Sequence, residues 1–249
     1  MLWRATLTCV LVLSAALAAA GAQKLADDRS RQEAVASYRS GQQLMAEEKF
    51  AAGADQFIKA TNKDPLFTLA HYGLGQAYMN LRQYPNAVKA FEACIEASRQ
   101  LYALSETSRF EVEKRRDDDV REARETVAAL QRSGHTALAL RAEQHLADLE
   151  KQKTSASSAF RPPAEVLLSL GSAHFRDGKL ISAESAWKAA LEVNPKFGEV
   201  HNNLAVVYLM TERFKEAEDE VRQAERAGFR VNPQLKNDLK DRQPPSISK

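Results

Sequence analysis

The clearest pattern in the sequence is a helical alternation of apolar and polar positions. Between residues 68 and 99, apolar residues recur at spacings of three and four and form two stripes. Such spacings place the apolar side chains on one face of a helix. The stripes are separated at residues 82–85, where Pro85 suits the first turn of a new helix. The segment therefore predicts two amphipathic helices joined by a tight turn.

This two-helix unit is repeated. Residues 34–65 match residues 68–99 at an offset of 34, and a later pair of segments matches at the same offset. The identical residues of the first pair are Tyr38 and Tyr72, Gly41 and Gly75, Gln42 and Gln76, and Met45 and Met79. The corresponding residues of the later pair include Leu170 and Leu204, Gly171 and Ala205, and Ala183 and Ala217.

The repeated units resemble the tetratricopeptide-repeat family. The matching residues of the second unit are His71, Leu74, Gly75, Tyr78, Tyr84, Ala87 and Phe91. Those of the third unit are Leu170, Gly171, His174, Ala183, Trp187, Ala190 and Pro195. The resemblance covers somewhat more than half of the chain and implies an all-α solenoid of about four helical hairpins in two pairs. It also implies a protein that works by binding other proteins.

Small residues occupy the middle of the first helices, at Gly41, Gly75, Gly171 and Ala205. Glycine costs about 1 kcal/mol relative to alanine inside a helix, so a neighbouring helix is expected to approach closely there. The second helices offer small residues that are expected to oppose them. These residues are Gly53, Ala87, Ala183 and Ala217.

The two pairs of repeats are separated by something that is not a repeat, because Gly75 and Gly171 lie 96 residues apart. Residues 100–153 are strongly charged and helical in pattern, and a break at residues 133–135 predicts an antiparallel helical hairpin. The predicted inner residues are Val120, Ala123, Val127 and Leu130 on one helix, and Leu138, Ala142, His145 and Leu149 on the other. The charged run at 114–119 favours ion pairs within the helix over a cation site.

The predicted layout follows from these boundaries. It comprises a signal peptide (1–22), a first repeat pair (30–99), a charged helical hairpin (100–153), a linker (154–163), a second repeat pair (164–230), and a capping helix with a disordered tail (231–249). The linker allows the two pairs to move relative to one another, whereas a rigid hairpin bridging them is the alternative.

The N-terminus has the features of a secretory signal. Arg4 precedes an apolar run at 7–20, and the small residues Ala20 and Ala22 predict cleavage after Ala22. We therefore expect export to the periplasm or secretion. An uncleaved membrane anchor is the alternative, although the run is shorter than the about 20 residues of a typical span. After cleavage only Cys94 remains, so no internal disulfide is expected.

Composition and charge narrow the function. The net charge of +2 produces no strong positive electrostatic field that would attract nucleic acid. The five histidines are scattered, and the sequence has no His-Glu-x-x-His string, phosphate-binding glycine loop or nucleophile elbow. We therefore expect no catalytic residues, no metal, no cofactor and no small-molecule substrate, and an enzyme is the least favoured class.

The candidate binding site lies on the first helices, which line the concave face of such solenoids. Its predicted residues are Tyr38, Gln42, Met45, Tyr72, Gln76, Met79, Leu168, Phe175, Asn202, Val206 and Leu209. The family resemblance implies that Asn203, with Asn80, holds the main chain of a peptide. The alternative is that Tyr38 and Tyr72 pack between helices. Because no lysine or arginine cluster lines these positions, the family's carboxylate-clamp mode is not expected.

Two classes of function remain open. The first is an exported adaptor that holds a peptide or helix of a partner protein in the concave groove. The second is a structural subunit of a permanent envelope complex or homo-oligomer, with the groove already occupied.

Overall fold

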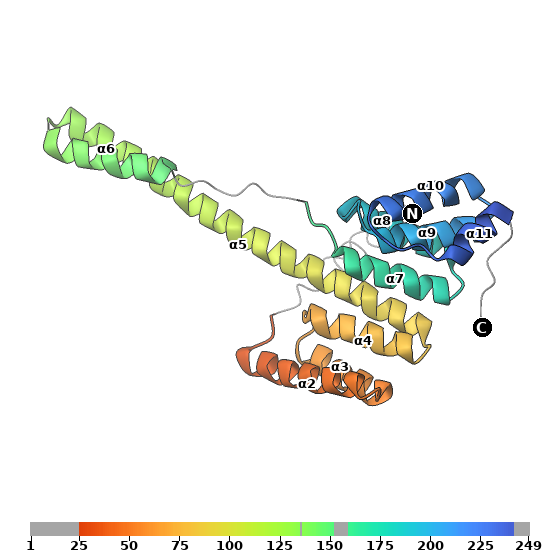
Figure 1. Cartoon of the computed structure of the whole chain (residues 1–249). Helices are drawn as coiled ribbons and strands as arrows, with labels where there is room; N and C mark the ends of the chain where they lie inside the picture. The colour runs from red at the N-terminus through yellow and green to blue at the C-terminus, as the bar shows by residue number, and fades with distance from the viewer. Residues whose placement is uncertain (1–24, 135, 152–158, 242–249) are drawn as a thin grey trace, which may run out of the picture. The chain divides into compact units, whose positions relative to one another are not determined.

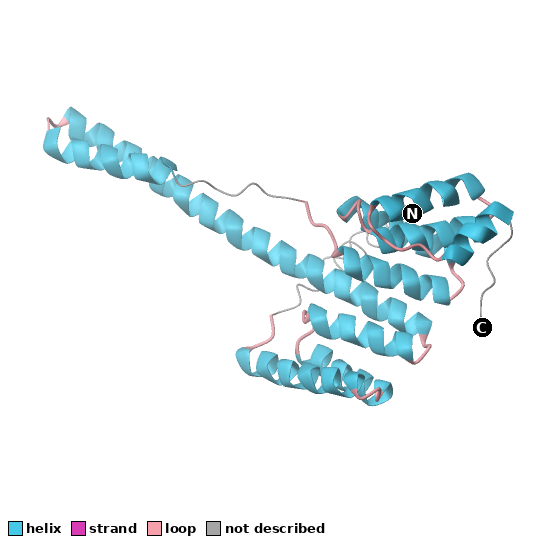
Figure 2. Ribbon diagram, in the orientation of Figure 1, coloured by secondary structure: helices cyan, strands magenta, loops and turns pink. Residues whose placement is uncertain are grey.

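The computed structural model describes residues 25–134, 136–151 and 159–241, and all regular structure in these ranges is helical (Figure 2). The all-α prediction is therefore confirmed. The chain divides into two compact units, one containing Met1–Ala97 with Ala164–Lys249 and the other Ser98–Pro163. The predicted signal peptide and the tail beyond residue 241 lie outside the described residues.

The first unit contains the predicted solenoid (Figure 1). Its helices are α2 (Asp28–Ala46), α3 (Phe50–Lys63), α4 (Thr68–Asn80), the first part of α5 (Tyr84–Arg132), α7 (Ala164–Arg176), α8 (Leu180–Val193), α9 (Gly198–Met210), α10 (Phe214–Arg226) and α11 (Pro233–Asp241). Helices α2 to α5 and α7 to α10 form four successive hairpins, the second of them packed by Gly75 on α4 against Phe91 on α5, and α11 packs against α10.

The turns of the four hairpins share one backbone geometry. A residue with positive φ follows each first helix, at Glu48 (57°), Arg82 (58°), Gly178 (76°) and Glu212 (58°). The next amide then donates back into the helix; for example, Gln83 N lies 2.9 Å from the carbonyl oxygen of Tyr78. This is how a left-handed residue satisfies the last carbonyls of a helix. Only the third repeat has glycine there, the residue that adopts this φ without strain.

Aromatic rings fill the space beside the small residues of the first helices. A Cβ atom on Gly41 would lie 2.7 Å from Cε1 of Phe57, and one on Gly73 would lie 2.8 Å from the same atom. Gly75 lies still more tightly against Phe91, and Gly171 against Trp187. The second-helix residues Ala87, Ala183 and Ala217 are fully buried. The small residues of the second helices were expected to oppose the glycines of the first helices. The side-chain atoms nearest to these glycines are instead aromatic ring atoms of the second helix.

The two pairs of repeats share one continuous core. A buried cluster joins α5 to α7 and α8, and it contains Ala87, Val88, Phe91, Cys94, Val166, Leu170, Ala173 and Ala186. The hydroxyl of Tyr72 on α4 also lies 3.2 Å from Oγ of Ser169 on α7. The second and third repeats are therefore neighbours in the stack, rather than halves joined by a flexible link.

The second unit is a helical hairpin. Helix α5 continues from Ser98 to Arg132, and after a turn α6 (Thr136–Lys151) runs antiparallel to it. Hydrogen bonds join the two helices: Arg124 donates twice to Glu150 (2.7 and 3.2 Å), and Gln131 donates to Glu143 (2.6 Å).

The prediction of inner residues was right for α5 and partly wrong for α6. On α5, the less exposed residues of the paired stretch are Val120, Ala123, Val127 and Leu130. On α6 they are Ala139, Ala142, Leu146 and Leu149, whereas Leu138 and His145 are exposed. The inner residues of α6 recur at spacings of three, four and three, as those of α5 do. This shared spacing keeps Ala142 and Leu149 inside and puts Ala139 and Leu146 there in place of Leu138 and His145.

Among the described residues, no helix is both long and apolar enough to cross a bilayer.

Candidate protein-interaction surface

The predicted aromatic residues of the first helices pack inside the repeats. The ring centroid of Tyr38 lies 5.8 Å from that of Phe57 and 5.1 Å from that of Phe67. Burial raises the pKa of the Tyr38 hydroxyl. Tyr72 packs at 5.7 Å from Phe91, and its hydroxyl reaches α7. These contacts correspond to the interhelical packing that the sequence allowed as the alternative.

The last residue of each predicted stripe also serves packing. A Cβ atom on Gly53 would lie 3.3 Å from Met45 Cγ, so Met45 rests against its own second helix. Phe175 packs 5.9 Å from Trp187, and Leu209 is fully buried. Leu168 accepts the Trp187 indole N–H through its carbonyl at 3.1 Å. Met79, like Phe175, is partly buried against a core cluster.

Three predicted residues remain exposed, and all three carry carboxamides: Gln42 on α2, and Gln76 and Asn80 on α4. Gln42 Nε2 donates to the Tyr38 hydroxyl at 2.8 Å, and Asn80 Nδ2 donates to the backbone carbonyl of Gln76 at 2.9 Å. Each carboxamide oxygen can still accept, and an amide can both donate and accept. We call Gln42, Gln76 and Asn80 the carboxamide row.

One apolar residue near this row was missed by the sequence analysis. Leu69 on α4 is 54% exposed. It precedes Gln76 by seven residues, or about two helical turns, so the two side chains share a face of the helix. The signal was a leucine at the helix start outside the repeated apolar stripe.

Helix α9 adds a polar group that lacks a partner. Oδ1 of Asn202 is buried and has no hydrogen-bond partner among the described residues. Leaving a buried acceptor unpaired costs about 1–3 kcal/mol. Asn203 and Val206 on the same helix are half-buried. The structure therefore places Asn203 and Val206 partly at the surface, whereas the unpaired acceptor of Asn202 lies beneath it.

A polar cluster links the second helix of the third repeat to the fourth repeat. Glu184 Oε2 accepts from Arg213 at 2.8 Å, and its other oxygen lies 2.6 Å from Lys188 Nζ. The Arg213 guanidinium lies 4.1 Å from the centre of the Tyr208 ring. Burial raises the pKa of the Glu184 carboxyl, but its hydrogen bonds to Lys188 and Arg213 outweigh that effect, so the pKa lies below its ordinary value. Glu184 is therefore a structural carboxylate.

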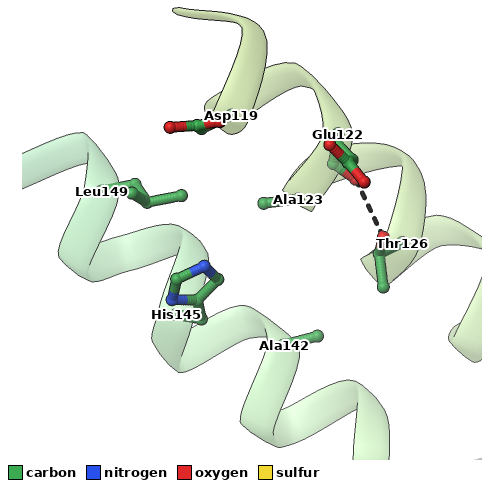
Figure 3. A pocket seen from close by; sticks show the side chains of 7 residues that line it. All are labelled: Asp119, Glu122, Ala123, Thr126, Ala142, His145 and Leu149. Atoms are coloured by element: carbon green, nitrogen blue, oxygen red, sulfur yellow. Dashed lines mark hydrogen bonds between the residues drawn. The ribbon is translucent and has the colours of Figure 1, made fainter. Parts of the chain in front are cut away.

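The hairpin carries a shallow hollow between α5 and α6 (Figure 3). It is lined by Asp119, Glu122, Ala123, Thr126, Ala142, His145 and Leu149. The hydrogen bond drawn there joins Thr126 Oγ1 to the backbone oxygen of Glu122, at 2.9 Å within one helix. The charged run behaves similarly, since Arg116 pairs with Asp117 and Arg121 with Asp118. These groups stabilise the hairpin and do not converge on a reacting atom.

Comparison with known proteins agrees with the repeat architecture. A tetratricopeptide-repeat family model matches residues 38–101 and 168–228. No curated protein sequence matches the chain.

Several solved structures resemble the chain. The first TPR of Spaghetti (RPAP3), bound to the HSP90 peptide SRMEEVD, is 14% identical, with 82% of this chain and 98% of that chain covered and a TM-score of 0.42. TTC0263, a thermophilic TPR protein of Thermus thermophilus, is 19% identical, with 84% and 98% covered and a TM-score of 0.34. YrrB, a TPR protein with an unusual peptide-binding site, is 18% identical, with 86% and 94% covered and a TM-score of 0.30.

Proposed function

The chain belongs to the tetratricopeptide-repeat family, and from this premise we propose that it is a scaffold that binds a partner protein along its first helices. The observation that carries the proposal is the carboxamide row, Gln42, Gln76 and Asn80, which is exposed on two neighbouring repeats. Stacked helical repeats typically present such extended surfaces to their partners.

The chemistry of the row suits a polypeptide backbone. A peptide in extended form offers N–H and C=O groups along its length, and carboxamides meet both kinds. The exposed Leu69 offers an apolar contact on the same helix as two of them. The partner is therefore an extended or helical segment with apolar side chains and accessible backbone or amide groups.

The surface does not favour recognition of a free C-terminal carboxylate. The carboxamide row is uncharged, and an anion is best held by lysine or arginine. A neutral internal segment of a partner is the better match.

We also propose that the protein works outside the cytoplasm, in the periplasm or as a secreted protein. The support is the apolar N-terminal run followed by Ala20 and Ala22. N-terminal sequencing of the protein from an envelope or secreted fraction tests this proposal. A chain that begins at Gln23 supports it, and a chain that retains residues 1–22 in the membrane supports the anchored alternative.

The binding experiment uses substitutions that leave the core intact. The variant Gln76→Arg/Asn80→Arg changes two exposed residues of the row, whereas changes at Tyr38 or Tyr72 would also disturb packing. Its matched control is Asn62→Arg/Gln223→Arg, which changes two exposed amides on the second helices α3 and α10.

Partners are captured by crosslinking from the native envelope fraction and compared by mass spectrometry. The expected result is a partner captured by the wild type and the control, and lost with the Gln76/Asn80 variant. If the Gln76/Asn80 variant captures the same proteins at the same level, the first-helix surface is not the binding site.

A further inference from the structure

The turn end of the helical hairpin differs in charge from the rest of it. Residues 126–142, which we call the tip, contain no aspartate or glutamate, and their only lysine or arginine residues are Arg132 and Arg141. The other residues from 98 to 151 include eleven carboxylates and eight lysine or arginine residues. The tip is therefore positively charged on a hairpin that is otherwise slightly acidic.

The nearest carboxylates are set back from the turn. Helix α5 ends at Arg132 and α6 begins at Thr136, at one end of the hairpin (Figure 1). Glu125 and Glu143 each lie seven residues from these helix ends, which is about 10 Å along a helix. Glu143 is in addition held by a hydrogen bond from Gln131 at 2.6 Å. Negative side chains thus begin only beyond this depth.

Two leucines project from the tip on opposite sides of the hairpin. Leu138 is 49% exposed and Leu140 is 58% exposed. Ala139, which lies between them in the sequence, is buried on the inner face of α6. Since successive residues are about 100° apart around an α-helix, the two leucines flank that inner face, one on each side.

This arrangement favours a surrounding medium over a flat partner. A protein surface against one side of the hairpin would cover one leucine and leave the other in water. Entry of the tip end-on into the boundary between headgroups and acyl chains of a bilayer covers both. Interfacial elements sink about 5–10 Å into that boundary, and Leu140 lies four residues, or about 6 Å, beyond the start of α6. The leucines are within this depth, and Glu125 and Glu143 stay outside it.

The two arginines are placed to meet lipid phosphates. Both are exposed, and Arg132 Nε donates to the backbone oxygen of Ala128 at 3.1 Å, which leaves its other guanidinium N–H groups to donate. Among the described residues, neither Arg132 nor Arg141 pairs with a carboxylate. Guanidinium groups bind phosphate strongly, and their long stems keep the charge at headgroup level while apolar neighbours enter the bilayer.

From this combination we propose that the tip binds the surface of an anionic lipid bilayer, with Leu138 and Leu140 entering it and Arg132 and Arg141 on lipid phosphates. So few groups give weak and reversible binding, which decreases as salt screens the charges. The site lies on the hairpin unit and shares no residue with the carboxamide row, so it does not rest on the proposed binding of a partner protein.

The test is cosedimentation with lipid vesicles. The chain used begins at Gln23, which keeps every described helix and removes the apolar run at 7–20 that would itself bind lipid. Vesicles of phosphatidylglycerol mixed with phosphatidylcholine are compared with vesicles of phosphatidylcholine alone. We expect the affinity for the anionic vesicles to be at least about tenfold higher, because each arginine near such a surface contributes about fivefold.

The leucines are tested by the variant Leu138→Ser/Leu140→Ser. It is expected to lower the affinity for anionic vesicles at least about fivefold, because it removes the apolar contact with the bilayer. The matched control is Leu101→Ser/Leu104→Ser, which changes two exposed leucines of α5 outside the tip and is expected to bind like the wild type.

The arginines are tested by Arg132→Gln/Arg141→Gln, which is expected to remove most of the preference for anionic over neutral vesicles. The matched control is Arg115→Gln/Arg121→Gln, which lowers the net charge equally at exposed positions outside the tip. We expect it to keep that preference.

Circular dichroism of each variant verifies that its helices remain. Binding by the wild type and both controls, with losses in both tip variants, establishes the site. The inference is overturned if the wild type ignores anionic vesicles, binds neutral ones equally well, or is weakened as much by the control changes. It is also overturned if the tip variants bind vesicles normally but lose a protein that the wild type crosslinks, because the tip would then bind that protein.

Discussion

At the scale of single residues, the repeats are set by matched pairs of small and large side chains. In three repeats a glycine of the first helix lies against an aromatic ring of the second: Gly41 with Phe57, Gly75 with Phe91, and Gly171 with Trp187. The fourth repeat has Ala205 and Val221 at the corresponding positions, both buried. A smaller residue on one helix thus accompanies a larger one on the other, because the helices keep similar spacing.

We expect Gly75→Ala to destabilise the protein by about 1–2 kcal/mol, because overpacking costs about 1–3 kcal/mol and alanine returns part of this through helix propensity. In a Phe91→Val background, which imitates the fourth repeat, the same change is expected to cost at least about 1 kcal/mol less. Urea unfolding of the four proteins in this double-mutant cycle measures the coupling. Additive costs would contradict contact between the ring and the glycine as the cause.

Glu184 makes a pH-dependent contribution. The pKa of its carboxyl is lower in the folded protein than its ordinary value of 4.5. The contribution is therefore fully present above the unfolded pKa and is lost as the pH falls through the folded one. We expect Glu184→Gln to reduce the free energy of unfolding by about 1 kcal/mol at pH 7, and the difference from the wild type to shrink as the pH falls below about 5. The control is Glu218→Gln, an exposed carboxyl on α10; a difference that is constant with pH would exclude the ionised Glu184 as its source.

At the scale of secondary-structure elements, the repeat helices were predictable because their periodicity recurs in four copies. The hairpin was harder. The choice between Leu138 with His145 and Ala139 with Leu146 as inner residues depends on how α6 faces α5, and residue hydrophobicity favours Leu138 over Ala139. The positive-φ turns at Glu48, Arg82 and Glu212 were also not predictable, because glycine marks this geometry in just one of the four turns within the repeats, at Gly178.

The turn geometry leads to a pair of opposite expectations. Gly178 has φ of 76° and nothing within 4 Å of an added Cβ, so Gly178→Ala is expected to cost about 1 kcal/mol through backbone strain alone. Conversely, Glu212→Gly relieves the same strain, and we expect it to stabilise by up to about 1 kcal/mol. Thermal unfolding followed by circular dichroism measures both changes. A loss of stability with Glu212→Gly would mean that the side chain contributes more than the strain costs.

At the scale of the whole molecule, the candidate surface was only partly predictable. Position in the repeat identified the first helices, but it did not distinguish residues that face outward from those covered by their own repeat. Tyr38 and Tyr72 are covered because Phe57 and Phe91 lie beside them, and this depends on packing across helices. Gln42 and Gln76, one turn later, remain exposed. The outward residues therefore had to come from the structure.

Because the four repeats share a continuous core, we expect them to fold without the hairpin unit. Elsewhere, successive repeats are joined by four-residue turns at 64–67 and 194–197, each closed by an amide of phenylalanine donating to the carbonyl three residues earlier (3.0 Å for Phe67 and 3.2 Å for Phe197). Replacing 98–163 with the sequence Asn-Pro-Lys-Phe of 194–197 restores this joint between α5 and α7. We expect the shortened chain to unfold cooperatively, as measured by urea titration followed by circular dichroism, because the cluster of Phe91 with Val166 and Leu170 is unchanged.

The same variant tests whether the repeats alone bind the partner. It keeps Gln76 and Asn80, so we expect it to capture the same partner as the full chain. If the repeats failed to fold, the shared core would be insufficient without the hairpin. If they folded but lost the partner, the hairpin would contribute to binding, and the first-helix surface alone would not account for the function.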